Sequence, residues 1–183
     1  MRVLAIAGSL RRGSYNRRLL DDAARLAPAG VLVEVWEGLR DLPHFDQDAE
    51  GESPAAVARL RDALRGADAL LVATPEYNSS LPGVLKNALD WASRPPGSSA
   101  LRGLPVAVVS ASTSRFGGVW AAQEVRKVLG ASGARVVDAQ MALPQAHEGF
   151  DEQGRLRSAE LAARLRAVLD ALAAEAAEEA AAA

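Results

Sequence analysis

The chain has 183 residues, of which 49% are apolar and 24% are charged, an ordinary composition for one globular domain with a full core. Its 21 basic and 23 acidic residues give a net charge of −2, so no basic field favours nucleic-acid binding. The chain has no cysteine, which excludes disulfides, iron–sulfur clusters and thiol catalysis and agrees with a cytoplasmic location.

Short apolar runs alternate with helical patterns along the chain. Several runs are apolar at successive positions, which is typical of strands covered on both faces in a parallel sheet. Five strands are predicted, at Val3–Ala7, Val31–Trp36, Ala69–Ala73, Val106–Val109 and Arg135–Ala139.

Helices are predicted between and after these strands, at Arg17–Ala27, Pro54–Arg65, Pro82–Ser93, Val119–Ala131 and Ala159 to about Ala176. The second should have Ser53 as its N-cap and Pro54 at its first helical position, and should end at Gly66. Residues 176–183 are rich in Ala and Glu but have nothing large to pack, so this tail is expected to fray.

Strand–helix alternation repeated five times, without an internal repeat or a dividing linker, predicts one doubly wound α/β domain over residues 1–175. The expected architecture is a three-layer sandwich, with helices on both faces of a five-stranded parallel sheet of order 2-1-3-4-5. Ligands of such sheets bind beyond the carboxyl ends of the strands, so the strand-to-helix loops should carry the function.

The first such loop, GSLRRGSYN from Gly8 to Asn16, lies between a strand end and a helix start. Backbone N–H groups and the positive end of a helix dipole would meet there, which favours a phosphate. Neither GxGxxG nor GxxxxGK[ST] is present, so a Rossmann dinucleotide and a P-loop nucleotide are disfavoured. The possible phosphate donors are Ser9, Ser14, Asn16 and either Arg11 or Arg12. An equally weighted alternative is a polar turn in which Asn16 only caps the helix.

The second loop opens the segment TPEYNSSLPGVLKNALDW from Thr74 to Trp91. Tyr77 and Asn78 offer a flat ring and an amide, which suit a planar heterocycle, and the backbone N–H groups from Glu76 to Asn78 should be free of any strand ladder. Taken alone, the loop is better explained as a surface turn whose tyrosine packs on its own helix.

The third loop, SASTSRFGG from Ser110 to Gly118, contains small residues that let a ligand ring approach the backbone. Gly117 and Gly118 have the alternative role of a helix entry. A phosphate site at one strand end and a ring platform at its neighbours describe a mononucleotide.

The motifs GSLRRGSYNRRL and PEYNSSLPGVLKNALDW, about sixty residues apart, closely resemble the NADPH-dependent FMN reductase family. This flavodoxin-like group includes chromate, quinone and azo-dye reductases. The resemblance covers about residues 1–175, including the segment from Leu42 to Asp48 and the turn from Phe150 to Gly154.

The resemblance implies three groups of FMN-binding residues. The phosphate group would be held by Ser9, Arg11, Ser14 and Asn16, with Tyr15 beside them; the isoalloxazine ring would be bordered by Pro75, Glu76, Tyr77 and Asn78, and closed on its other side by Ser110, Ala111 and Ser112. Family members often have a hydroxyl residue where Ala111 stands, so a backbone contact is expected there.

The resemblance also implies the reaction. NADPH or NADH would give hydride to FMN, which would reduce a small acceptor such as a quinone, an azo compound, chromate or free flavin. No acid–base residue is required; Arg94 is the only candidate for touching the acceptor or a nicotinamide phosphate, and a plain surface or interface arginine is its alternative. His44 and His147 lie far apart in sequence, so no metal is expected.

Family members are usually homodimers or homotetramers, and the Pro82–Ser93 helix is expected to contribute to such an interface. No apolar run approaches the length of a membrane span and no signal-peptide pattern opens the chain, so no membrane contact is expected. The main alternative function is a flavodoxin-type electron carrier, although carriers of that type are usually more acidic. A phosphorylated receiver domain would need carboxylates at the strand ends, where this chain has Gly8 and Ser9.

Overall fold

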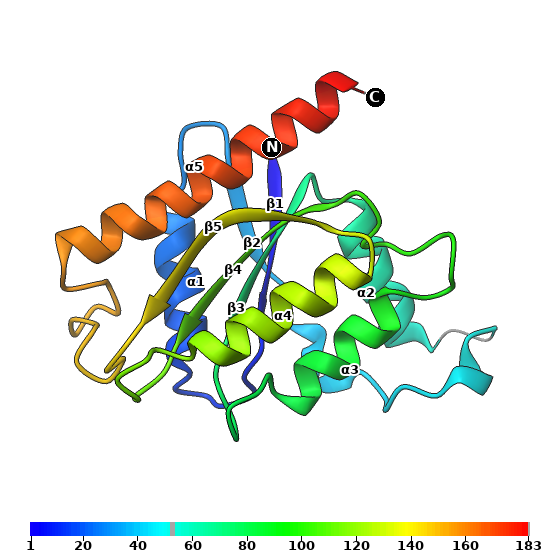
Figure 1. Cartoon of the computed structure of the whole chain (residues 1–183), viewed down its shortest axis with the longest axis horizontal. Coiled ribbons are helices and arrows are strands. Elements are labelled where there is room, and N and C mark those ends of the chain that lie inside the picture. The colour runs from blue at the N-terminus through cyan, green and yellow to red at the C-terminus, as the bar shows by residue number, and fades with distance from the viewer. Residues whose placement is uncertain (52–53, 183) are drawn as a thin grey trace.

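The computed structural model describes residues 1–51 and 54–182. Five parallel strands form one sheet in the order β2-β1-β3-β4-β5 (Figure 1), which confirms the predicted doubly wound fold. The winding reverses between β1 and β3, so the loops that follow these two strands leave the same edge of the sheet side by side. The strands are β1 (Arg2–Ala7), β2 (Leu32–Val35), β3 (Ala69–Thr74), β4 (Pro105–Ala111) and β5 (Arg135–Leu143).

Helices cover both faces of the sheet and make two separate cores. On β1, Val3 and Ala5 face the core under α1 and α5, whereas Leu4 and Ile6 face the core under α2, α3 and α4 (Figure 1). This alternation explains why the strands are apolar at successive positions. The helices are α1 (Tyr15–Leu26), α2 (Ala55–Arg65), α3 (Gly83–Ala92), α4 (Val119–Ala131) and α5 (Ala159–Ala182), with short 3-10 turns η1 (Gly38–Asp41) and η2 (Gln47–Ala49).

Several element ends differ from the prediction. Helix α1 begins at Tyr15, two residues early, because Ser14 caps it. Pro54 was predicted as the first helical residue of α2 but is its N-cap, and the predicted N-cap, Ser53, lies outside the described residues. Gly66 ends α2 as predicted, with its N–H bonded to the Asp62 carbonyl.

The last helix does not end near Ala176 but continues to Ala182. Arg135 on β5 supplies the reason: its Nε lies 2.9 Å from Glu175 Oε1, and it also pairs with Glu179. These contacts tie the carboxyl-terminal turns to the sheet despite the absence of large apolar side chains. Although α5 has 24 residues, neither it nor another helix within the described residues combines the length and apolar character needed to cross a membrane.

Candidate functional site

The loop after β1 is fixed at both ends. At its start, the Gly8 N–H donates to the Ala73 carbonyl on β3 at 2.8 Å, and a Cβ at Gly8 would lie 2.9 Å from Leu85 Cδ2. At its end, the residue Ser14 is 4% exposed, and its hydroxyl accepts a hydrogen bond from the Arg17 N–H at 3.3 Å. The loop therefore runs over the sheet edge into the positive end of the α1 dipole.

Asn16 joins the first loop to the third instead of capping the helix. Its Nδ2 donates to the Ala111 carbonyl and its Oδ1 accepts from the Ala111 N–H, both at 2.9 Å, and the residue is 2% exposed. The β3–β4 ladder ends at the pair Thr74 and Ser110, so Ala111 lies one residue beyond it. Asn16 thus supplies the two backbone partners that β3 no longer provides.

The second loop is a tight hairpin. Tyr77 and Ser80 exchange two backbone hydrogen bonds of 3.1 Å, and between them Asn78 and Ser79 have φ values of 53° and 60°. This is a two-residue type I′ turn. The Tyr77 N–H lies outside the five strands of the sheet, as predicted, but it is bonded to Ser80 within the turn, and Asn78 lies at the exposed tip of the turn.

Glu76 connects the second loop to α4. Its Oε2 accepts hydrogen bonds from the Trp120 and Ala121 N–H groups at 3.1 and 3.2 Å. These donors belong to the first turn of α4, where the helix itself offers them no partner. Close packing supports the bond, because a Cβ at Gly118 would lie 3.5 Å from Glu76 Cβ. The carboxylate therefore neutralises the positive end of this helix.

Glu76→Ala should lower the free energy of unfolding by about 1–2 kcal/mol, because α4 loses a charged cap. Urea denaturation measures the change. Glu148→Ala is the matched control: the Glu148 side chain is 68% exposed, and its loss should change stability by no more than about 0.5 kcal/mol. Equal losses in the two variants would contradict the capping role.

The third loop begins as a strand end and finishes as a helix entry. Ser110 is fully buried, and a Cβ at Gly118 would lie 3.3 Å from the Ser110 Cβ. The Ser110 side chain therefore packs against the glycine at the end of the loop. Gly117 and Gly118 both have positive φ, and a Cβ at Gly117 would lie 2.8 Å from the Leu143 carbonyl carbon. The alternative of a helix entry is confirmed, since Gly118 is the N-cap of α4.

The three loops enclose a cavity of about 100 Å³. Most of the predicted binding residues form its wall, and Asn78 and Ser110 are the two that do not. Thr113 lines the cavity but was not predicted, although it continues the run of small hydroxyl residues in SASTS. The lining residues are Ser9, Arg11, Ser14, Tyr15, Asn16, Pro75, Glu76, Tyr77, Ala111, Ser112 and Thr113.

An aromatic contact braces α1 beside this cavity. The Tyr15 ring stacks on Phe150 with centroids 6.2 Å apart and an interplanar angle of 7°. Phe150 forms a β-bridge with Leu156, whose N–H donates to the buried Asp22 carboxylate at 3.0 Å. The segment after β5 is therefore anchored to the helix that carries the first loop.

Arg94 is not brought to the cavity. It follows α3, whose last residue, Ala92, accepts a hydrogen bond from the Ala100 N–H in the segment that leads into β4, at the sheet edge opposite the three loops. Its Nε is 3.6 Å from Glu50 Oε1, and its guanidinium lies 5.9 Å from the centre of the Phe45 ring. Within one chain, Arg94 contributes nothing to the three-loop site.

The two histidines lie on separate segments. His44 belongs to the loop after η1, and His147 lies beyond β5 with its Nε2 3.3 Å from Glu148 Oε1. Among residues 1–51 and 54–182, no group of three His, Asp or Glu side chains is placed to hold a metal ion. The cavity wall offers hydroxyl, guanidinium, amide and carboxylate groups together with the exposed ring of Tyr77.

Known proteins are similar to this chain in sequence and in structure. Residues 1–148 match the protein family described as NADPH-dependent FMN reductase. An NAD(P)H-dependent FMN reductase of Pseudomonas aeruginosa is 43% identical over 158 residues, which cover 85% of this chain and 84% of the relative. A quinone reductase of Pseudomonas putida is 42% identical over 161 residues, 84% of this chain and 83% of the relative. The solved structure of FerB, a flavoenzyme NAD(P)H:(acceptor) oxidoreductase from Paracoccus denitrificans, has a TM-score of 0.88 at 32% identity, and the match covers 97% of this chain and 98% of that chain.

Proposed function

Because this chain belongs to the NADPH-dependent FMN reductase family, we propose that its three-loop cavity binds FMN and that its acceptor is a quinone. The protein is a flavodoxin-like NAD(P)H-dependent reductase. FMN, when bound, would supply the chemistry of hydride transfer between a nicotinamide and an acceptor. The convergence of the two predicted motifs on one cavity is the observation that carries the proposal.

The first loop has the donors that a terminal phosphate requires. Ser9 and Ser14 carry hydroxyls on the cavity wall, and Arg11 adds a guanidinium. The Ser14 oxygen accepts from Arg17, which leaves its hydrogen to donate. The Tyr15 and Asn16 N–H groups lie in the first helical turn, where α1 offers them no partner. Together these groups support a phosphate at the amino end of α1.

The second and third loops are suited to border a ring mainly by packing. The Tyr77 N–H is bonded to Ser80, and both backbone groups of Ala111 are bonded to Asn16. The backbone contact expected at Ala111 is therefore a van der Waals contact and not a hydrogen bond. Other polar groups in this part of the wall include the Ser112 and Thr113 hydroxyls and the backbone N–H of Glu76.

Exposed aromatic side chains support the proposal that the acceptor is a flat molecule such as a quinone. Tyr77, Phe116 and Trp120 are 46%, 44% and 43% exposed, and the Phe116 and Trp120 rings meet edge to face at 4.9 Å. Tyr77 lines the cavity, and the Trp120 N–H is bonded to Glu76 on the cavity wall. A quinone ring can pack against such side chains. Azo compounds, chromate and free flavin are the other acceptors to test.

Ser9→Ala should weaken FMN binding about ten- to a hundredfold, the effect of one hydrogen bond to a charged group. Fluorescence titration of the apoprotein with FMN measures this change. Ser98→Ala is the matched control, because Ser98 is an exposed serine in the loop after α3. An FMN affinity equal to that of the control would remove Ser9 from the phosphate site.

We also propose a homodimer or homotetramer in the cytoplasm. Support comes from an apolar groove of about 730 Å³ beside α3, whose wall includes Leu39, Leu42, Phe45 and Val84. Sedimentation of the purified protein should give a mass two or four times the 19.2 kDa of one chain, and a monomer would contradict the assembly.

A further inference from the structure

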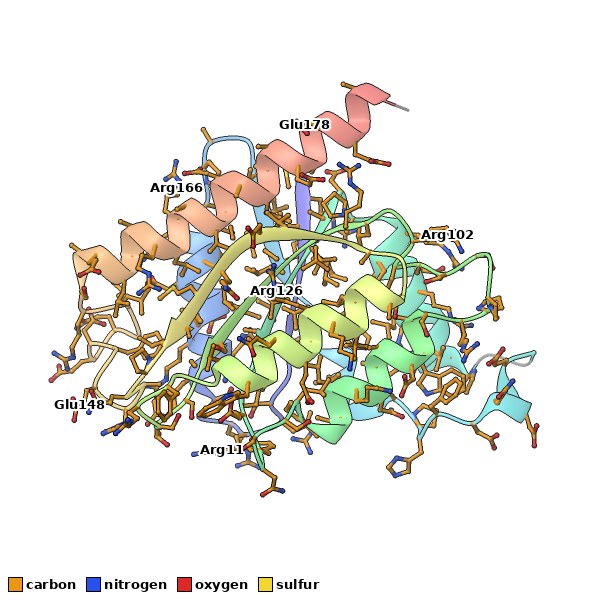
Figure 2. All side chains as sticks on the ribbon, viewed as in Figure 1. Arg11, Arg102, Arg126, Glu148, Arg166 and Glu178 are labelled. Carbon is orange, nitrogen blue, oxygen red and sulfur yellow. The ribbon has the colours of Figure 1, made fainter. Side chains whose placement is uncertain are left out.

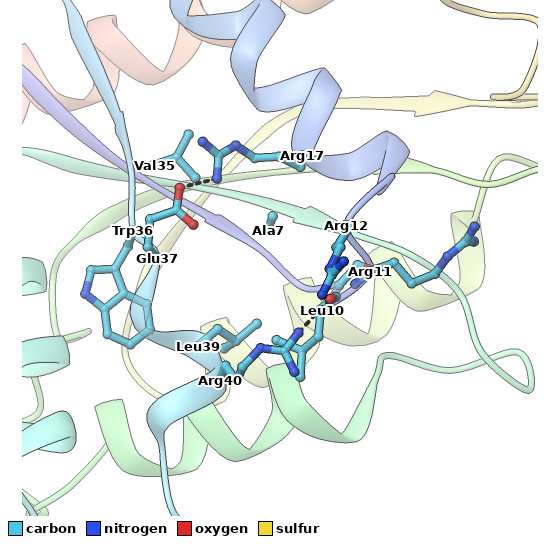
Figure 3. A pocket seen from close by; sticks show the side chains of 11 residues that line it. Ala7, Leu10, Arg11, Arg12, Arg17, Val35, Trp36, Glu37, Leu39 and Arg40 are labelled. Atoms are coloured by element: carbon cyan, nitrogen blue, oxygen red, sulfur yellow. Dashed lines mark hydrogen bonds and ion pairs between the residues drawn. The ribbon is translucent and has the colours of Figure 1, made fainter. Parts of the chain in front are cut away.

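A second cavity, of about 230 Å³, adjoins the proposed phosphate end of the FMN site. Ser9 and Arg11 line both cavities, and both residues belong to the loop to which the FMN phosphate is assigned. Side chains from this loop, from α1 and from the residues after β2 converge on the second cavity (Figure 3). A group joined to the FMN phosphate would therefore extend from the first cavity into the second.

The second cavity is rich in arginine, although the net charge of the chain is −2. In the described part of the chain, Glu37 is the one carboxylate on its wall, and it pairs with Arg17. Within residues 1–51 and 54–182, Arg12 and Arg40 form no ion pair with a carboxylate. These two guanidinium groups are therefore available for an anion in addition to Arg11.

Arg40 is held in place by the first loop. Its Nη2 donates to the Leu10 carbonyl at 2.8 Å, which ties η1 to that loop (Figure 3). The η1 turn is anchored in turn by Leu39, which is 4% exposed. One hydrogen bond uses a small part of a guanidinium that has five N–H donors. Arg40 therefore retains donors for a phosphate oxygen on the cavity side.

The indole of Trp36 adds an aromatic surface to the wall of this cavity. A Cβ at Gly38 would collide with Trp36 Cζ2, so the ring packs directly on the backbone of the η1 turn. The Trp36 N–H donates to the Ala5 carbonyl at 2.8 Å, which fixes the residue at the end of β2. A half-buried indole of this kind offers a flat heterocycle, such as a purine, a surface on which to stack.

We propose that the second cavity binds the adenosine monophosphate half of FAD, so that the protein accepts FAD as well as FMN. The inference rests on the proposed function, because the flavin half would occupy the three-loop cavity. In FAD a second phosphate is joined to the phosphate of FMN, and the negative charge is shared between the two.

The two phosphates of FAD would meet different groups. The first would stay at the amino end of α1, as proposed for FMN, and Arg12 and Arg40 would face the second. The absence of GxGxxG does not oppose this arrangement, because arginine side chains and not a glycine turn would hold the second phosphate. Trp36 would pack against the adenine.

Titration calorimetry of the apoprotein with each flavin tests the proposal. The unmodified protein should bind FAD at least as tightly as FMN. Arg40→Gln should weaken FAD binding at least tenfold, the effect of one hydrogen bond to a charged group, and leave FMN affinity within about twofold. Trp36→Leu should likewise weaken only FAD binding. Arg102→Gln is the matched control, because it makes the same charge change at an exposed arginine far from Arg11 (Figure 2), and it should alter neither affinity.

The two flavins separate this inference from the proposed function. Weaker binding of FAD than of FMN by the unmodified protein would overturn the proposal. Equal losses of both affinities in Arg40→Gln would also overturn it, by placing Arg40 at the first phosphate, and so would an Arg40→Gln protein with both affinities unchanged. FMN binding without FAD binding would remove only this inference, whereas an apoprotein that binds neither flavin would contradict the proposed function itself.

Discussion

Trp91→Ala is expected to lower the free energy of unfolding by about 3–5 kcal/mol, the range for truncating a buried tryptophan. Trp91 is fully buried on α3, and its ring meets Phe45 edge to face at 4.9 Å. Its Nε1 also donates to the Pro43 carbonyl at 2.9 Å, and Asn87 Nδ2 donates to the same oxygen at 2.8 Å. Truncation would leave a cavity and remove one of the two hydrogen bonds that α3 donates to the Pro43 carbonyl.

Urea denaturation tests this expectation. Trp120→Ala removes the same side chain from a position that is 43% exposed and should cost at most about 1 kcal/mol. Trp91→Phe retains most of the apolar volume but loses part of the ring and the bond to Pro43, so its loss of unfolding free energy should lie between those of Trp91→Ala and Trp120→Ala. If Trp91→Ala unfolded at the urea concentration of the unmodified protein, the packing described for α3 would be wrong.

Asn16→Ala is expected to lower the stability of the apoprotein by roughly 2–6 kcal/mol, because two buried backbone groups of Ala111 lose their partners. It should also weaken FMN binding, since the first and third loops would no longer be held together. Stability and FMN affinity therefore fall together in this variant.

Ser9→Ala is the comparison that makes the Asn16 result interpretable. Ser9 is half-buried on the cavity wall, and its Oγ makes one long contact, 3.4 Å, with the Arg11 N–H. Its removal should weaken FMN binding with little change in the urea midpoint. If Asn16→Ala behaved in the same way, with full stability, Asn16 would be a ligand of the phosphate and not a clamp.

Local patterns were sufficient to predict the strand order and the three loops. Each loop follows an apolar run, and the carboxyl ends of parallel strands share one edge, so the converging segments could be found without coordinates. The exact start of α1 could not be predicted from local patterns. Ser14 and Asn16 are both good caps, and the choice between them depends on a bond from Asn16 to Ala111, 95 residues away.

Long-range geometry also explains the other differences. Ser110 was expected near the ligand, but β4 continues to Ala111, which makes Ser110 a strand residue that is buried against Gly118. The bond from the Tyr77 N–H to Ser80 was not predicted, because a turn with two left-handed residues, neither of them glycine, carries little sequence signal. Arg40 on η1 donates a hydrogen bond to the Leu10 carbonyl in the first loop, and no sequence motif predicts this contact.

Anaerobic stopped-flow mixing of the FMN-loaded protein with NADPH tests the central claim most directly. The flavin absorbance should bleach within the turnover time without any second protein, and mixing the reduced protein with a quinone should restore it. An FMN-loaded protein that neither NADPH nor NADH bleaches would contradict the account and favour a flavodoxin-type electron carrier.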